Sequence, residues 1–115
     1  MENKDRYAHL RLMMDCFRKV KDYTKEMSYE AFLLDSKTQS AVIMQLQVIG
    51  ELSKKILDDT KSQIDIPWKQ IAGMRDVVSH DYFNLDIKFV WDTAMKSVPE
   101  AESEIGKYLK EFNTL

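Results

Sequence analysis

The chain has 115 residues, of which 44% are hydrophobic and 31% charged, an ordinary composition for a globular protein that buries a single core. Its formal net charge of -2 excludes the strongly basic overall balance that is typical of nucleic-acid-binding proteins. Charged residues are scattered through the first eleven positions and no apolar run approaches the roughly 20 residues of a membrane span, so we expect a cytoplasmic protein without membrane contact.

The first predicted helix runs from a cap at Asn3 or Asp5 to about Met27. It is indicated by apolar residues at helical spacing, namely Tyr7, Leu10, Met13, Met14, Phe17, Val20 and Met27. Basic residues occupy its other faces, namely Arg11, Arg18, Lys19, Lys21 and Lys25. We interpret these as solvated surface, and contact with an RNA backbone or an acidic partner is the alternative. Cys16 cannot form an internal disulfide and is expected to be a buried thiol.

A short helical turn at residues 29–34 follows, with Ser28 as its cap and with Phe32 and Leu33 in the core. A long helix is then predicted from a cap at Asp35 or Ser36 to about Asp59. Its inward stripe and the residues that widen it are Val42, Leu46, Ile49, Leu52 and Ile56, with Ala41, Met44, Val48 and Leu57.

Gly50 lies in the middle of this long helix, where glycine costs roughly 1 kcal/mol relative to alanine. Such a residue indicates that another helix approaches closely at that position. Glu51 is next to Gly50 and is expected at the same crossing. It is either a functional carboxylate or a solvated, salt-bridged one.

Residues 58–65 are polar and form the longest predicted connection. Pro67 is suited to the first turn of a new helix, which we expect to end near His80. Asp86 caps the next helix, and Pro99 either kinks that helix or starts a fresh one. The apolar stripes of these segments are Trp68, Ile71, Ala72 and Val78, then Ile87, Val90, Trp91, Ala94 and Val98, and finally Ala101, Ile105, Tyr108 and Phe112. The predicted fold is an all-α up-and-down bundle of four to five helices.

Residues 73–82 contain the chemistry-bearing side chains of the chain. Arg75 offers a fixed positive fork for phosphate or carboxylate. His80 can both take and give a proton near neutral pH. Asp76 is four residues before His80 and is placed to orient its imidazole, while Tyr82 follows the expected helix end. Arginine and histidine together are a minimal set for phosphoryl-ester chemistry.

The geometry of this stretch leaves a second interpretation open. Arg75 and His80 lie about 140° apart around a straight helix, so they converge only if His80 is at the helix end. His80 could instead be only a helix C-terminal residue that is favourable toward the helix dipole. Arg75 and Asp76 could belong to surface ion pairs of little energetic value. No metal-ligand cluster, glycine-rich phosphate loop or dinucleotide motif is present, and no cofactor is expected.

The pattern Arg-x4-His-x-Tyr, with a polar residue directly after the arginine, resembles the signature of HEPN domains. More narrowly, it is similar to the HepT-type toxins that pair with a minimal nucleotidyltransferase antitoxin. The similarity extends along nearly the whole chain, through residues 35–42, 48–56, 67–75, 89–91 and 98–99. Arg-x4-His alone would be a weak signal, and this order of surrounding elements makes it specific.

The resemblance implies a single HEPN-like helical domain over residues 1–115 and a metal-independent endoribonuclease toxin of a type II toxin-antitoxin system. Arg75 and His80 would be the catalytic residues, with Asp76 in support. HEPN domains dimerise with two such motifs facing one cleft, so a homodimer or higher oligomer is implied. The antitoxin, a nucleotidyltransferase of the MntA kind, would attach AMP to Tyr82.

A different class of function remains open. The chain could be a non-catalytic partner subunit of a minimal nucleotidyltransferase, which holds a nucleotide or the partner and cleaves nothing. The acidic net charge fits this second hypothesis somewhat better than it fits a nuclease.

Overall fold

The computed structural model describes residues 6–80 and 84–112, with only the backbone described for residues 76–80. This part of the chain is all-helical and contains no strand, as the sequence predicts. The elements in chain order are α2 (Ala8–Tyr23), α3 (Tyr29–Leu33), α4 (Ser36–Ser53), α5 (Asp58–Lys61), α6 (Trp68–His80), α7 (Ile87–Asp92), the π-helical η2 (Thr93–Ser97) and α8 (Val98–Glu111).

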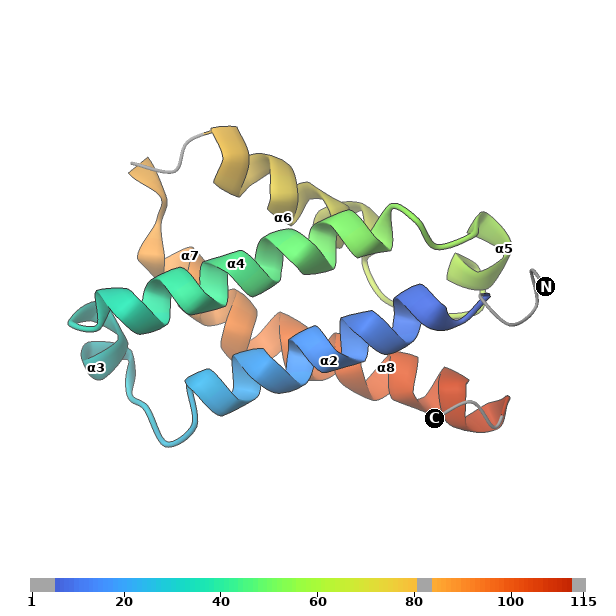
Figure 1. The fold of residues 1–115 in the computed structure, drawn as a ribbon, viewed down its shortest axis with the longest axis horizontal. Coiled ribbons are helices and arrows are strands. Elements are labelled where there is room, and N and C mark those ends of the chain that lie inside the picture. Colours follow the sequence, from blue (N-terminus) through green and yellow to red (C-terminus); the bar gives the residue numbers. More distant parts are fainter. Residues whose placement is uncertain (1–5, 81–83, 113–115) are drawn as a thin grey trace.

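The long helices form an up-and-down bundle with α4 at its centre (Figure 1). α4 packs along α2 on one side and along α6 on the other. The segment α7–η2–α8 runs back along the bundle and packs on α2. The predicted HEPN-like helical bundle is therefore confirmed. Within the described residues, no helix is long and apolar enough to cross a membrane.

The apolar stripes of the four long segments meet in one continuous core. Its largest fully buried side chains are Phe17, Phe32, Leu10, Met13, Leu46, Ile49, Ile105, Leu109, Val20, Val42, Val90 and Val98. Most of these positions follow from the helical spacing. The core also contains Ile43 and Leu109, which the predicted stripes omit.

Four residues predicted to face the core lie at the surface instead, and one of them is Phe112, which is 42% exposed at the end of α8. Leu33 is 45% exposed, Met44 is 55% exposed and Leu57 is 58% exposed. Met44 lies within α4 and is still exposed, so its hydrophobicity alone does not place it inside. Leu33 and Leu57 lie beside helix ends, where the backbone leaves the helical register that the prediction assumed.

Two predicted helix ends are wrong by several residues. α2 ends at Tyr23 and not at Met27, because the chain turns through residues 24–26 and Glu26 adopts a positive φ of 59°. α4 ends at Ser53 and not at Asp59. There the buried Ser53 hydroxyl donates to the carbonyl of Gly50, and a tightened turn follows. The expected polar connection at residues 58–65 contains the short helix α5.

Three predicted N-caps are confirmed by their hydrogen bonds. Ser28 Oγ accepts from the backbone N–H of Ala31 at 3.1 Å. Asp35 accepts from the backbone N–H of Thr38 at 3.0 Å. Asp86 accepts from the N–H groups at the start of α7. Each cap satisfies helix donors that have no partner within the helix.

The cap at Asp35 has a pH dependence that follows from its hydrogen bonds. The backbone N–H and hydroxyl of Thr38 lower the pKa of the Asp35 carboxyl below its ordinary value of 3.8. A lowered pKa in the folded state gives stability that is present above the ordinary pKa and is lost as the pH falls through the lowered one. We expect the melting-temperature advantage of the wild type over Asp35→Asn, a cap that does not titrate, to shrink between about pH 5 and about pH 2.5. A constant difference over that range would contradict this prediction.

The helical backbone continues from α7 through η2 into α8, which contains Pro99, so the choice between a kink and a fresh helix stays open. Pro99 lies in the first turn of α8, directly after the π-helical segment η2. Proline has no N–H and so cannot donate to the carbonyl four residues earlier. The wider π turn before Pro99 therefore costs no α-helical hydrogen bond at this position. At the far end of α8, Phe112 is half exposed and stacks on Tyr7.

Cys16 is buried in the core, as predicted. Burial raises the pKa of its thiol, and only the thiolate reacts with disulfide reagents. We expect the native protein to react with Ellman's reagent at least about tenfold more slowly than the protein unfolded in guanidinium. Equal labelling rates in the two states would show that the thiol is accessible.

Candidate active site

The first turn of α6 is fixed by Trp68. Its indole Nε1 donates to the carbonyl oxygens of Lys61 at 3.1 Å and of Ile64 at 3.0 Å. The backbone N–H of Ile71 donates to the carbonyl of Pro67, which starts the helix as the proline predicts. These bonds join the start of α6 to the end of α5. The axis of α6, and with it the position of Arg75, is thereby anchored at one end.

Gly50 allows α6 to approach α4 closely at Arg75. A Cβ placed on Gly50 would lie 2.9 Å from the backbone nitrogen of Arg75 and 3.2 Å from the carbonyl oxygen of Ile71. Both neighbours are backbone atoms, which cannot rotate away as a side-chain end can. The close approach that the sequence predicts at Gly50 is therefore confirmed, and its partner is the helix that carries Arg75.

Arg75 forms an ion pair across this crossing. Its Nε lies 2.6 Å from Oε1 of Glu51, the residue next to Gly50. The two side chains are 46% and 49% exposed, so the guanidinium is accessible to solvent and to a ligand. Glu51 is therefore salt-bridged, and its partner is the arginine that the sequence singles out. Sequence spacing gave no signal for this pairing beyond the glycine next to Glu51.

The other predicted site residues are placed less completely. His80 is the last residue of α6. Its backbone therefore lies at the helix end, as convergence with Arg75 requires. The side chains of Asp76 and His80 lie outside the described part of the structure. Tyr82 lies outside the described residues altogether. Convergence of the guanidinium and the imidazole therefore stays a prediction.

A groove near α6 does not contain this ion pair. A hollow of about 700 Å³ lies between the first half of α6 and the segment η2–α8. Its lining residues include Ile66, Ile71, Met74, Lys96 and Ala101, and neither Glu51 nor Arg75 is among them. Arg75 and Glu51 thus lie outside this hollow, at the crossing of α4 and α6. Among the described residues, no group of three or more His, Cys, Asp or Glu side chains is arranged to hold a metal ion.

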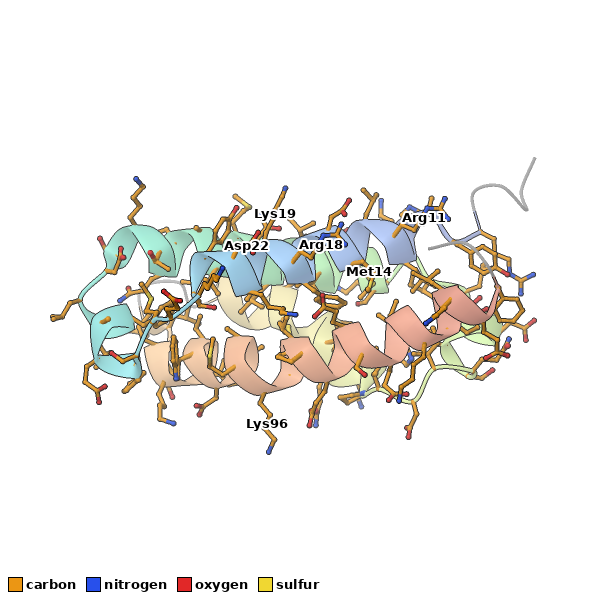
Figure 2. The ribbon with its side chains drawn as sticks, turned by 90° about the horizontal axis from the view of Figure 1, so that it is seen from below. Arg11, Met14, Arg18, Lys19, Asp22 and Lys96 are labelled. Carbon is orange, nitrogen blue, oxygen red and sulfur yellow. The ribbon has the colours of Figure 1, made fainter. Side chains whose placement is uncertain are left out.

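The predicted basic residues of the first helix are at the surface, as their positions indicate. Arg11, Arg18 and Lys19 extend from α2, whereas Lys96 extends from the opposite edge of the molecule (Figure 2). Arg18 forms an ion pair with Asp15 within α2. Contact of this helix with RNA or an acidic partner stays the untested alternative.

Comparison with known proteins identifies the family of the chain. The family model of the HepT-like ribonucleases matches residues 13–108, which include Glu51, Arg75 and His80. The chain belongs to the HepT-like ribonuclease family. No solved structure matches the chain with significance.

Curated relatives extend the family match to nearly the whole chain. A probable ribonuclease HepT of Thermococcus cleftensis is 40% identical over 92 residues, which cover 79% of this chain and 84% of the relative. Two putative RNases of Methanocaldococcus jannaschii are 36% and 38% identical, each over 113 residues or 97% of this chain. These alignments cover 93% and 97% of the two relatives, so this HepT-like chain is similar to them from end to end.

Proposed function

We propose that this protein is a metal-independent endoribonuclease that cleaves RNA at the Arg75–His80 motif. The observation that carries the proposal is the match to the HepT-like ribonuclease family over residues 13–108, together with a half-exposed Arg75 at the α4–α6 crossing. An exposed guanidinium is suited to a phosphodiester, because its planar fork of donors matches phosphate oxygens.

In the proposed reaction, the 2′-hydroxyl of the RNA attacks the adjacent phosphorus and the bond from phosphorus to the 5′-oxygen breaks. One imidazole takes the proton of the 2′-hydroxyl, and the leaving 5′-oxygen receives a proton. Arg75 stabilises the negative charge that grows on the phosphoryl oxygens. A single His80 cannot easily serve both oxygens, so we propose a homodimer in which two motifs share one cleft. Asp76 would orient His80.

We further propose that the protein acts in the cytoplasm as the toxin of a toxin-antitoxin pair. The antitoxin would be a nucleotidyltransferase, and the Tyr82 oxygen would attack the α-phosphorus of ATP and release pyrophosphate. The AMP attached to Tyr82 would add bulk and negative charge near Arg75. It would thereby exclude and repel the phosphate of an incoming RNA.

The second candidate function is a non-catalytic partner subunit of such a nucleotidyltransferase. The net charge of -2 favours it, because a nuclease that binds RNA along an extended surface usually carries excess positive charge. The Arg75–Glu51 pair would then be a surface ion pair without a chemical role.

One experiment separates the two candidates. Purified protein is incubated with a mixed-sequence RNA and with the DNA of the same sequence, both in the presence of a chelator. The endoribonuclease predicts cleavage of the RNA alone, because DNA lacks the attacking 2′-hydroxyl. An inert protein that binds a co-expressed nucleotidyltransferase tightly would contradict the nuclease and support the partner subunit.

A further inference from the structure

Two neighbouring residues of α4 hold the two ends of Arg75. At the backbone end, the missing Cβ of Gly50 lets the nitrogen and Cβ of Arg75 approach to 2.9 Å and 3.1 Å of the position that such an atom would occupy. At the guanidinium end, Oε1 of Glu51 lies 2.6 Å from Nε. The backbone of Arg75 thus packs closely against α4, and its guanidinium forms an ion pair with the same helix.

The Glu51 contact is made at the inner side of the guanidinium. It uses Nε, the nitrogen nearest the aliphatic stem. Phosphate oxygens typically accept from the terminal amino groups of an arginine, which lie at the outer edge of the guanidinium. A carboxylate on Nε therefore fixes the plane of the guanidinium and is compatible with phosphate binding at its outer edge.

Neither stability nor substrate affinity gains much from this ion pair. Both side chains are about half exposed, and ion pairs of that kind contribute little to folding. A negative carboxylate next to the arginine also weakens the attraction of the site for an anionic phosphate. The effect that remains is on geometry, because a long side chain held in one orientation loses less freedom when it meets the transition state.

We propose that Glu51 is a positioning residue that orients Arg75 for RNA cleavage. The inference rests on the proposed ribonuclease function. Glu51 touches neither the reacting phosphate nor the transferred proton, and it acts only through the guanidinium. The proposal predicts a particular kinetic signature: removal of Glu51 lowers kcat, and it leaves KM unchanged or lowers it, because a repulsive charge is lost with the carboxylate.

The test compares Glu51→Ala and Glu51→Gln with the wild type, using a fluorogenic RNA oligonucleotide with chelator present. Glu51→Ala is expected to lower kcat by about 100-fold, the typical cost of misplacing a catalytic group by about 1 Å. Glu51→Gln keeps a neutral acceptor for Nε–H and is expected to lose about tenfold. KM should stay within about threefold of the wild-type value or fall below it. Glu104→Gln, which removes the carboxylate of an exposed Glu104–Lys107 pair at 3.3 Å, should behave as the wild type.

Each other outcome overturns one defined part of the account. Unchanged or increased kcat in Glu51→Ala overturns the positioning role, and a rise in KM overturns it as well, because Glu51 would then support binding. An inert wild type overturns the proposed function itself. In that case the Nε–H proton of Arg75, assigned by its absence in Arg75→Lys, still tests the contact by NMR. It should exchange with water at least about tenfold more slowly in the wild type than in Glu51→Ala, and equal exchange rates would overturn the contact.

Discussion

Replacement of Arg75 by alanine is expected to lower the rate of RNA cleavage by about 10²- to 10³-fold, and replacement of His80 by alanine by about 10²- to 10⁴-fold. The first change removes the charge that meets the developing negative charge on the phosphoryl oxygens. The second removes the group that transfers protons. The measurement is the initial rate of cleavage of a labelled RNA by each purified variant, at matched protein concentration and with chelator present.

Arg18→Ala is the matched control for the arginine. Arg18 is exposed on α2 and forms an ion pair with Asp15, so its loss removes one positive charge and one ion pair without touching the α4–α6 crossing. We expect the rate of Arg18→Ala to stay within about threefold of the wild-type rate. An equal loss in Arg18→Ala and Arg75→Ala would indicate that general positive charge, and not the Arg75 site, supports cleavage.

Gly50→Ala is expected to destabilise the protein by up to about 2 kcal/mol and to lower the cleavage rate at the same time. The added methyl group would lie 2.9 Å from the backbone nitrogen of Arg75, so α6 must move away from α4. Overpacking of this kind costs about 1–3 kcal/mol, against a gain of roughly 1 kcal/mol in helix propensity. A loss of 1 kcal/mol corresponds to a fall of about 4–8 °C in melting temperature for a domain of this size. Thermal unfolding by circular dichroism measures it.

Gly106→Ala provides the opposite expectation on the same fold. Gly106 also lies inside a helix, α8, but its Cβ would meet only the methyl end of Met14 at 3.5 Å, an ordinary contact. The same substitution should therefore stabilise the protein by about 0.5–1 kcal/mol through helix propensity, with no change in cleavage rate. If both variants were stabilised alike, the α4–α6 crossing would not be as close as the structure indicates.

The sequence was sufficient for the helices, their caps and the crossing at Gly50. Caps such as Ser28 and Asp86 were predictable because a side-chain acceptor next to a helical apolar stripe has a local cause. Gly50 was informative because glycine lowers the stability of a helix, and a close helix–helix contact is a reason to keep it there.

The helix ends and the ion pair were not predictable in the same way. Ile56 is buried although it lies beyond the end of α4, so the apolar spacing continued where the helix did not. Glu26 has a positive φ in the turn after α2. Glutamate rarely adopts such a φ, so the residue type gave no indication of this turn. Pairing of Glu51 with Arg75 depends on how two helices cross, and local spacing does not contain that information.

The most direct test of the account is cleavage of an RNA that carries a single 2′-deoxy substitution at a linkage known to be cut. With chelator present, we expect the unmodified RNA to give fragments with 2′,3′-cyclic phosphate and 5′-hydroxyl ends, and the substituted RNA to resist cleavage at that linkage alone. Cleavage that continues at the deoxy linkage, or fragments with 5′-phosphate ends, would contradict attack by the 2′-hydroxyl and with it the proposed chemistry of Arg75 and His80.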